Sequence, residues 1–325
     1  MESRNFRSKK VGQVNIPAVN ECNIDFDDAI EIFKERYMRD DWSRRTLDFH
    51  IENFSNFRKY LATQVGNQES ISRDILEKYV MSMRSAGRKK NTINGRIKTL
   101  RVFFRVLLDN EYIGCNPAIS LRSIRGESTE IIPFDDEQVK ALLNIPNKDT
   151  FAGLRDWMIM QILLDSGIRL SELCNIQLSD INIKDKRLYI RKGKGRKSRT
   201  VFFGNDTRKA IQKYLRFTGI TDNDEYLVLN QDGGRLKPRS VQERISIHAA
   251  AAGIKGVRPS PHTFRHTFAK SFLMNNGDSC VLRDLLGHNS MSTVIIYLKL
   301  FGDDLQKKYQ GKSPVDRLFS KKHDD

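Results

Sequence analysis

Residues 261–298 read PHTFRHTFAKSFLMNNGDSCVLRDLLGHNSMSTVIIYL, a stretch in which cations, imidazoles and a phenol stand among apolar residues. The leading proline favours a helix start, and His262 and Arg265, three residues apart, share one face of that helix. His288 follows a Leu-Leu-Gly sequence that is typical of a helix end. Tyr297 lies inside the apolar run VIIYL. The stretch therefore predicts helices that carry several groups able to do chemistry.

Two further groups precede this stretch. The sequence SGIRLSEL places Arg169 at a turn directly after an apolar helix. The sequence GKGRKSR lies between two β-rich runs and places Lys194 at the tip of a hairpin. Lys192 and Lys197 lie in or beside the same turn and are alternatives to Lys194 for any chemical role there.

Each of these residues also has a purely structural explanation. Tyr297 fits a core aromatic residue, and His288 fits a helix cap. Arg169 fits a surface cation, His262 a helix N-terminal cap, and Lys194 a solvated turn residue. Only their combination favours a shared chemical task.

Taken together, the candidate side chains comprise cations, imidazoles and one phenol, with no carboxylate: Arg169, Lys194, His262, Arg265, His288 and Tyr297. Such a set suits attack on a phosphodiester without a metal, with Tyr297 as the nucleophile. Two arginine guanidinium groups and an imidazole would bind the charged oxygens of the transition state. The leaving oxygen needs a proton, and a lysine among neighbouring cations can supply one because they lower its pKa. Lys194 fits that task.

A zinc hydrolase is the first alternative, because His262 and His266 stand at i and i+4. The metalloprotease pattern H-E-x-x-H requires Glu where this chain has Thr263. No carboxylate lies nearby in the sequence to act as the base. We therefore expect no metal in this site.

The composition limits the class of protein. The chain has 325 residues, enough for about two domains. Lys and Arg total 56 against 40 Asp and Glu, and the formal charge of +16 favours a polyanionic partner. No stretch approaches the roughly 20 apolar residues of a membrane span, and the start MESRNFR lacks the apolar core of a signal peptide. The four cysteines lie far apart, which favours a reduced, cytoplasmic chain.

The pattern along the chain predicts a mostly α fold with a small antiparallel β-sheet in the second domain. The predicted parts are a basic flexible arm (1–24), a helical domain (25–120), a linker (121–132), a mixed α/β catalytic domain (133–302) and a C-terminal tail (303–325).

The helical domain has one strongly basic surface. Its clearest helix carries an apolar stripe through Ile93, Ile97 and Leu100, with cations on another face. The candidate nucleic-acid contacts are Arg88, Lys89, Lys90, Lys98, Arg101 and Arg105. A solvated basic face is the alternative for each of them.

The five motifs together resemble the tyrosine recombinases, the phage integrase family. The matching pieces are SGIRLSEL at 166–173, GKGRKSR at 193–199, HTFRHTFA at 262–269, LLGH at 285–288 and Tyr297. The helical region also looks like the core-binding domain of that family, so the resemblance covers most of the chain. Any one motif is weak evidence, but all five in order are specific.

The resemblance implies a role for each residue. Tyr297 would form a 3′-phosphotyrosyl link, while Arg169 and Arg265 clamp the scissile phosphate. Lys194 would protonate the leaving oxygen. The remaining roles are phosphate binding and proton transfer by His262 and His288, and support of the first arginine by Glu172. The covalent link conserves the energy of the bond, so neither ATP nor another cofactor is implied.

The resemblance also implies partners. In the family, four subunits assemble on two DNA sites, and a C-terminal segment such as 303–325 docks on the neighbouring subunit. We expect a recombinase of a mobile element, with an accessory directionality protein as a further partner. A chromosome or plasmid dimer-resolving recombinase is the alternative within the family. Two competing hypotheses remain, a type IB topoisomerase-like enzyme and a non-catalytic DNA-binding protein on the same fold.

Overall fold

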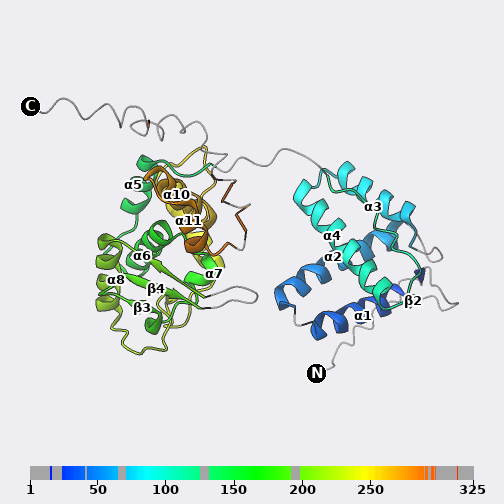
Figure 1. Ribbon diagram of the computed structural model, residues 1–325, viewed down its shortest axis with the longest axis horizontal. Coiled ribbons are helices and arrows are strands. Elements are labelled where there is room, and N and C mark those ends of the chain that lie inside the picture. The colour runs from blue at the N-terminus through cyan, green and yellow to red at the C-terminus, as the bar shows by residue number, and fades with distance from the viewer. Residues whose placement is uncertain are drawn as a thin grey trace, which may run out of the picture. The chain divides into compact units, whose positions relative to one another are not determined.

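The computed structural model describes residues 15–16, 24–40, 42–64, 71–124, 132–191, 198–288, 290–291, 294–295, 297 and 313. The chain divides into two compact units, residues 1–128 and 129–325 (Figure 1). The division falls inside 121–132, the stretch predicted as a linker. Each unit has its own apolar core and is described separately below.

The first unit is a helical bundle: α1 (Phe26–Arg39), α2 (Arg44–Gln64), α3 (Arg73–Ser85) and α4 (Lys90–Asp109). Side chains cap two of these helices at their starts: Asp25 accepts the Asp27 N–H, and Ser72 accepts the Ile75 N–H. The apolar stripes meet in an aromatic core in which the Phe33 and Phe54 rings lie 5.1 Å apart, edge to face.

One short ladder in this unit lies partly in the predicted arm. Strand β1 (Asn15–Ile16) pairs antiparallel with β2 (Ile24–Asp25). The arm prediction is therefore wrong for residues 15–16, which have a backbone partner. Two-residue strands carry too little periodicity to be seen in a sequence.

The second unit combines helices with a three-stranded sheet, so the predicted fold class is confirmed (Figure 1). Its strands, in the order β3-β4-β5, are antiparallel: β3 (Ile181–Asn182), β4 (Arg187–Ile190) and β5 (Arg199–Phe202). The helices are α5 (Asp136–Asn144), α6 (Phe151–Ser166), α7 (Leu170–Leu173), η1 (Leu178–Asp180), α8 (Asn205–Thr218), α9 (Pro238–Ala251), α10 (Pro261–Met274) and α11 (Ser279–Leu286). The hairpin β4–β5 agrees with the prediction, whereas β3 is an addition to it.

Helix α6 is the centre of this unit. It is buried on nearly every side and packs against α8 and α10. It ends at Gly167, whose φ of +58° suits a residue without a Cβ. A Cβ there would lie 2.3 Å from the Phe268 ring, so the turn also needs the missing side chain. This tight turn carries the chain into Arg169.

No helix in the ranges given above is both long enough and apolar enough to cross a bilayer. Residues 192–197, which include Lys194 and its competitors Lys192 and Lys197, lie outside the described residues.

Candidate active site

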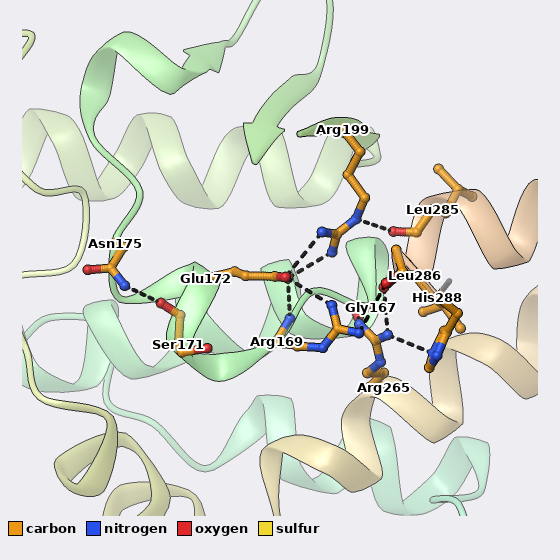
Figure 2. Close-up of polar contacts among 11 residues, drawn as sticks. Gly167, Arg169, Ser171, Glu172, Asn175, Arg199, Arg265, Leu285, Leu286 and His288 are labelled. Atoms are coloured by element: carbon orange, nitrogen blue, oxygen red, sulfur yellow. Dashed lines mark hydrogen bonds and ion pairs between the residues drawn. The ribbon is translucent and has the colours of Figure 1, made fainter. Parts of the chain in front are cut away.

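Arg265 is held at the centre of the site by three groups from two segments of the chain. Its side chain is 5% exposed, and its Nη1 donates to the Gly167 carbonyl at 2.7 Å. Its Nη2 donates to the Leu286 carbonyl at 2.6 Å and lies 2.8 Å from His288 Nε2 (Figure 2). The guanidinium therefore joins the end of α6 to the end of α11.

His288 takes its position from the end of α11. Gly287 adopts a left-handed conformation with φ of +63°, which turns the chain so that the next side chain faces Arg265. Because a guanidinium can only donate, His288 Nε2 accepts and the ring carries its proton on Nδ1. His288 is thus both a helix-end residue and a part of the site.

Glu172 joins two arginines. Its Oε1 accepts from Arg169 Nη1 at 3.0 Å, and its Oε2 accepts from Arg199 Nη2 at 2.7 Å. Figure 2 shows the carboxylate between the two guanidinium groups. Burial works to raise the pKa of Glu172, but the hydrogen bonds from Arg199 and the Arg169 backbone, together with both charges, lower it to about 2. Glu172 is ionised at neutral pH and binds both the backbone N–H and the guanidinium of Arg169.

Arg199 was not predicted as a site residue. Its Nε donates to the Leu285 carbonyl at 2.7 Å, so it ties β5 to the last turn of α11. A Cβ on Gly287 would lie 2.9 Å from Arg199 Nη1, so a side chain there would displace this guanidinium. The available signal was that Arg199 closes the GKGRKSR motif, but its partner lies 86 residues away.

Tyr297 is both a core aromatic residue and a site residue. Its side chain is 3% exposed and belongs to an apolar cluster with Leu273, Leu282 and Leu286. Burial raises the pKa of the phenol, while the charge of Arg265 and a hydrogen bond with it act in the opposite direction. The hydroxyl therefore keeps its proton beside a fixed cation.

His266 is the second residue that the sequence did not assign to the chemistry. Its Nδ1 lies 2.9 Å from the Tyr297 hydroxyl. Burial, followed by the charges of His262 and Arg265, lowers the pKa of His266 to about 4. The imidazole is therefore neutral at physiological pH.

His262 lies in the first turn of α10 and is exposed. Partial burial and then the charges of Arg265, Arg169 and Arg258 lower its pKa. Among the residues that the structure describes, no group of three or more His, Cys, Asp or Glu side chains is placed to hold a metal ion. These residues therefore offer no ligand set for the zinc ion of the alternative hypothesis.

The electrostatic character of the site is strongly positive. Burial and the charge of Arg169 lower the pKa of Arg265 to about 10, with Tyr297 and Glu172 opposing them. Arg265 remains cationic at neutral pH. Arg169 and Arg265 both contact backbone carbonyls of the segment 286–287, so one short turn holds the pair. Two guanidinium groups, two imidazoles and a phenol therefore converge in the second unit.

Comparison with known proteins identifies the family. The sequence profile of the phage integrase family matches residues 133–302. This chain belongs to the phage integrase family of tyrosine recombinases. The tyrosine recombinase XerC of Thermodesulfovibrio yellowstonii is 31% identical over 276 residues, covering 82% of this chain and 88% of the relative. That of Staphylococcus haemolyticus is also 31% identical and covers 86% of this chain and 94% of the relative.

A solved structure of a lambda integrase dimer bound to a core site has the same fold, with a TM-score of 0.69 and 16% identity. The match covers 82% of this chain and 96% of that chain. Tyrosine recombinases are site-specific recombinases, so this chain is an enzyme that breaks and rejoins DNA strands.

The predicted DNA contacts of this tyrosine recombinase lie at the start of α4 and along it. Arg88, Lys89, Lys98 and Arg105 are exposed, and Lys90 is half-buried. Arg101 differs from the prediction: it is half-buried and donates to the Leu121 carbonyl. That contact ties Arg101 to the segment after α4.

We expect Glu172→Gln to lower the free energy of unfolding of the recombinase by about 3 kcal/mol at pH 7. The pKa of the folded carboxyl lies below its ordinary value of 4.5, so the ionised form stabilises the fold above that pH. This stabilisation is lost as the pH falls from 4.5 towards 2. Urea unfolding at pH 7, 5 and 4 measures the difference in unfolding free energy between the variant and the unaltered protein. This difference should be smallest at pH 4.

The matched control is Glu243→Gln, which removes an exposed pair with Arg239 on α9. It should leave the unfolding free energy almost unchanged, because exposed pairs contribute little. A Glu172→Gln deficit of the same size at every pH would contradict the assigned ionisation.

Proposed function

We propose that this recombinase cleaves DNA with Tyr297 as the nucleophile, through a 3′-phosphotyrosyl intermediate that needs neither metal nor ATP. The observation that carries the proposal is the position of the Tyr297 hydroxyl beside Arg265. Arg265 also contacts His288, and Arg169 donates to the Gly287 carbonyl directly before His288. The phenol thus faces the groups best suited to hold a phosphate.

Each neighbouring group has a defined task in this proposal. Arg169 and Arg265 bind the non-bridging oxygens, whose negative charge grows in the transition state. His288 and His262 assist phosphate binding and proton transfer. Glu172 and Arg199 hold the first arginine and the end of α11 in place. Lys194, which lies outside the described residues, donates a proton to the leaving 5′-oxygen.

A trapping experiment tests the proposal. A nicked site lets the cleaved fragment diffuse away, so that the covalent complex accumulates. We expect mass spectrometry of the trapped complex to find the nucleotide on Tyr297. Attachment at another residue, or no adduct on any cognate site, would reject the assignment.

The basic face of α4 is proposed to bind the DNA backbone, and we expect the affinity to fall steeply with salt. Six or more phosphate contacts would cost about a thousandfold in affinity between 50 and 200 mM salt. Lys98→Gln and Arg105→Gln should each reduce the salt slope by about one. Arg101→Gln should lower stability and leave the slope unchanged, because that guanidinium binds a carbonyl.

Fluorescence anisotropy on a labelled duplex measures these slopes. Lys209→Gln, an exposed lysine on α8, is the matched control. A flat salt dependence of the unaltered protein would contradict a phosphate-binding face.

Two biological roles follow from the family, and the relatives favour one. The mobile-element role is supported by the fold shared with lambda integrase, at 16% identity. The dimer-resolving role is supported by XerC relatives at 31% identity along most of both chains. We therefore place dimer resolution in the cytoplasm ahead of mobile-element integration, with a homotetramer on two DNA sites as the active assembly.

The two roles differ in the phenotype of a deletion. Loss of a dimer-resolving enzyme leaves multimeric chromosomes or plasmids, which electrophoresis of intact DNA detects. Loss of a mobile-element recombinase instead stops excision of the DNA that flanks its gene, and that reaction would also reveal any accessory directionality protein.

A further inference from the structure

His266 contacts the one atom that the proposed reaction makes nucleophilic. Its Nδ1 lies 2.9 Å from the Tyr297 hydroxyl oxygen, and the two rings are 5.4 Å apart and tilted by 53°. The residue follows Arg265 directly on α10, and both side chains contact the Tyr297 hydroxyl. One helix therefore presents a cation and a neutral imidazole to the same phenol.

The phenol must donate its proton to satisfy both contacts. Burial raises the pKa of Tyr297, so the hydroxyl is protonated in the DNA-free protein. Arg265 can only donate to the hydroxyl oxygen. The neutral His266 ring can accept at Nδ1 when its own proton is on Nε2. The single phenolic proton then lies between the oxygen and His266 Nδ1.

We propose that His266 is the base that accepts the phenolic proton of Tyr297 when this residue attacks the scissile phosphate. The inference rests on the proposed function. The Oη–P bond forms, the P–O5′ bond breaks, and the phenolic proton moves to Nδ1. The leaving 5′-oxygen takes its proton from the general acid, proposed to be Lys194. Religation reverses each transfer, so no other reactant is needed.

DNA binding prepares His266 for this task. The charged and titratable groups acting on the ring are His262 and Arg265 on α10, and Tyr297 contacts it from the segment after α11. Arg169 acts on the phenol from the turn after α6. A phosphodiester bound by the two guanidinium groups offsets their charge, which makes the imidazole a stronger base. The proton acceptor thus becomes effective when a phosphate is in place.

The test uses two substrates and two variants. His266→Asn keeps an acceptor oxygen near the position of Nδ1 but cannot hold a proton, and Lys194→Ala removes the proposed acid. A nicked site with a sulfur in place of the leaving 5′-oxygen needs no acid, because a thiolate leaves unprotonated. Single-turnover cleavage rates are measured from pH 6 to pH 9 on both substrates.

We expect His266→Asn to cleave at least a hundredfold more slowly at pH 7 on both substrates. As the pH rises, the deficit in its cleavage rate should shrink by up to tenfold per pH unit, because solvent then ionises the phenol without the lost base. The sulfur substrate should restore the cleavage rate of Lys194→Ala, whereas His266→Asn should still cleave it slowly. His266→Gln should behave like His266→Asn, and DNA affinity should be unchanged in both.

Three results would overturn the inference: cleavage by His266→Asn within threefold of the unaltered protein, a deficit that is constant with pH, or recovery on the sulfur substrate. If the unaltered protein forms no adduct through Tyr297, the proposed function itself fails. An adduct in the unaltered protein with any of the three results rejects only the role of His266.

Discussion

Tyr297→Phe should abolish the covalent DNA adduct while leaving DNA binding intact. The substitution removes the only oxygen that the proposed reaction uses as a nucleophile. The ring remains in its apolar cluster, so the fold loses about 1 kcal/mol for the hydrogen bond to His266. Denaturing electrophoresis of the variant on a nicked site should show no shifted protein band.

The matched control is Tyr214→Phe, which changes another buried tyrosine of the same unit. The Tyr214 hydroxyl accepts the Leu229 N–H at 3.3 Å and lies on α8, so its loss should lower stability without affecting the adduct. An adduct that persists in Tyr297→Phe would show that a different residue attacks the phosphate.

Arg265→Lys should reduce the rate of cleavage by about a hundredfold to a thousandfold, although the charge is kept. The planar guanidinium reaches Gly167, Leu286 and His288 at once, and a single ammonium cannot match that geometry. The two carbonyls also lose a donor, which should destabilise the fold by about 1–3 kcal/mol. Single-turnover cleavage and urea unfolding measure the two effects.

Arg216→Lys is the control for this substitution, because Arg216 is exposed on α8 and donates to the Gln212 carbonyl of its own helix. It should change neither measurement. A cleavage rate for Arg265→Lys within tenfold of the unaltered protein would mean that a positive charge is sufficient for catalysis without the planar guanidinium and its hydrogen bonds.

Local signals in the sequence predicted most of the architecture. Asp25 and Ser72 are residue types that favour the helix N-cap positions they occupy, and the predicted apolar stripe of α4 is buried. The hairpin of β4 and β5 follows from alternation around a glycine-containing turn. These features depend on residues within one or two turns of each other, which is the range over which sequence patterns are informative.

The features that were missed depend on distant partners. Arg101 fits a cationic face in the sequence, but in the fold it contacts the Leu121 carbonyl. Arg199 is an ordinary strand arginine in the sequence, yet it meets Glu172 and the end of α11. His266 stood out only as half of a metal pair, because nothing in the sequence places it against a phenol 31 residues away.

The sequence by itself determined the chemical inventory and its order: two arginines, histidines and a late tyrosine, each on an element whose type follows from local periodicity. Tertiary structure alone decided which of them meet, because α6, β5, α10 and α11 converge through burial of their apolar faces. A side chain acquires its proton affinity from burial and from charges that packing brings near it. For that reason the neutral imidazole of His266 and the clamped guanidinium of Arg265 became visible only in the folded chain.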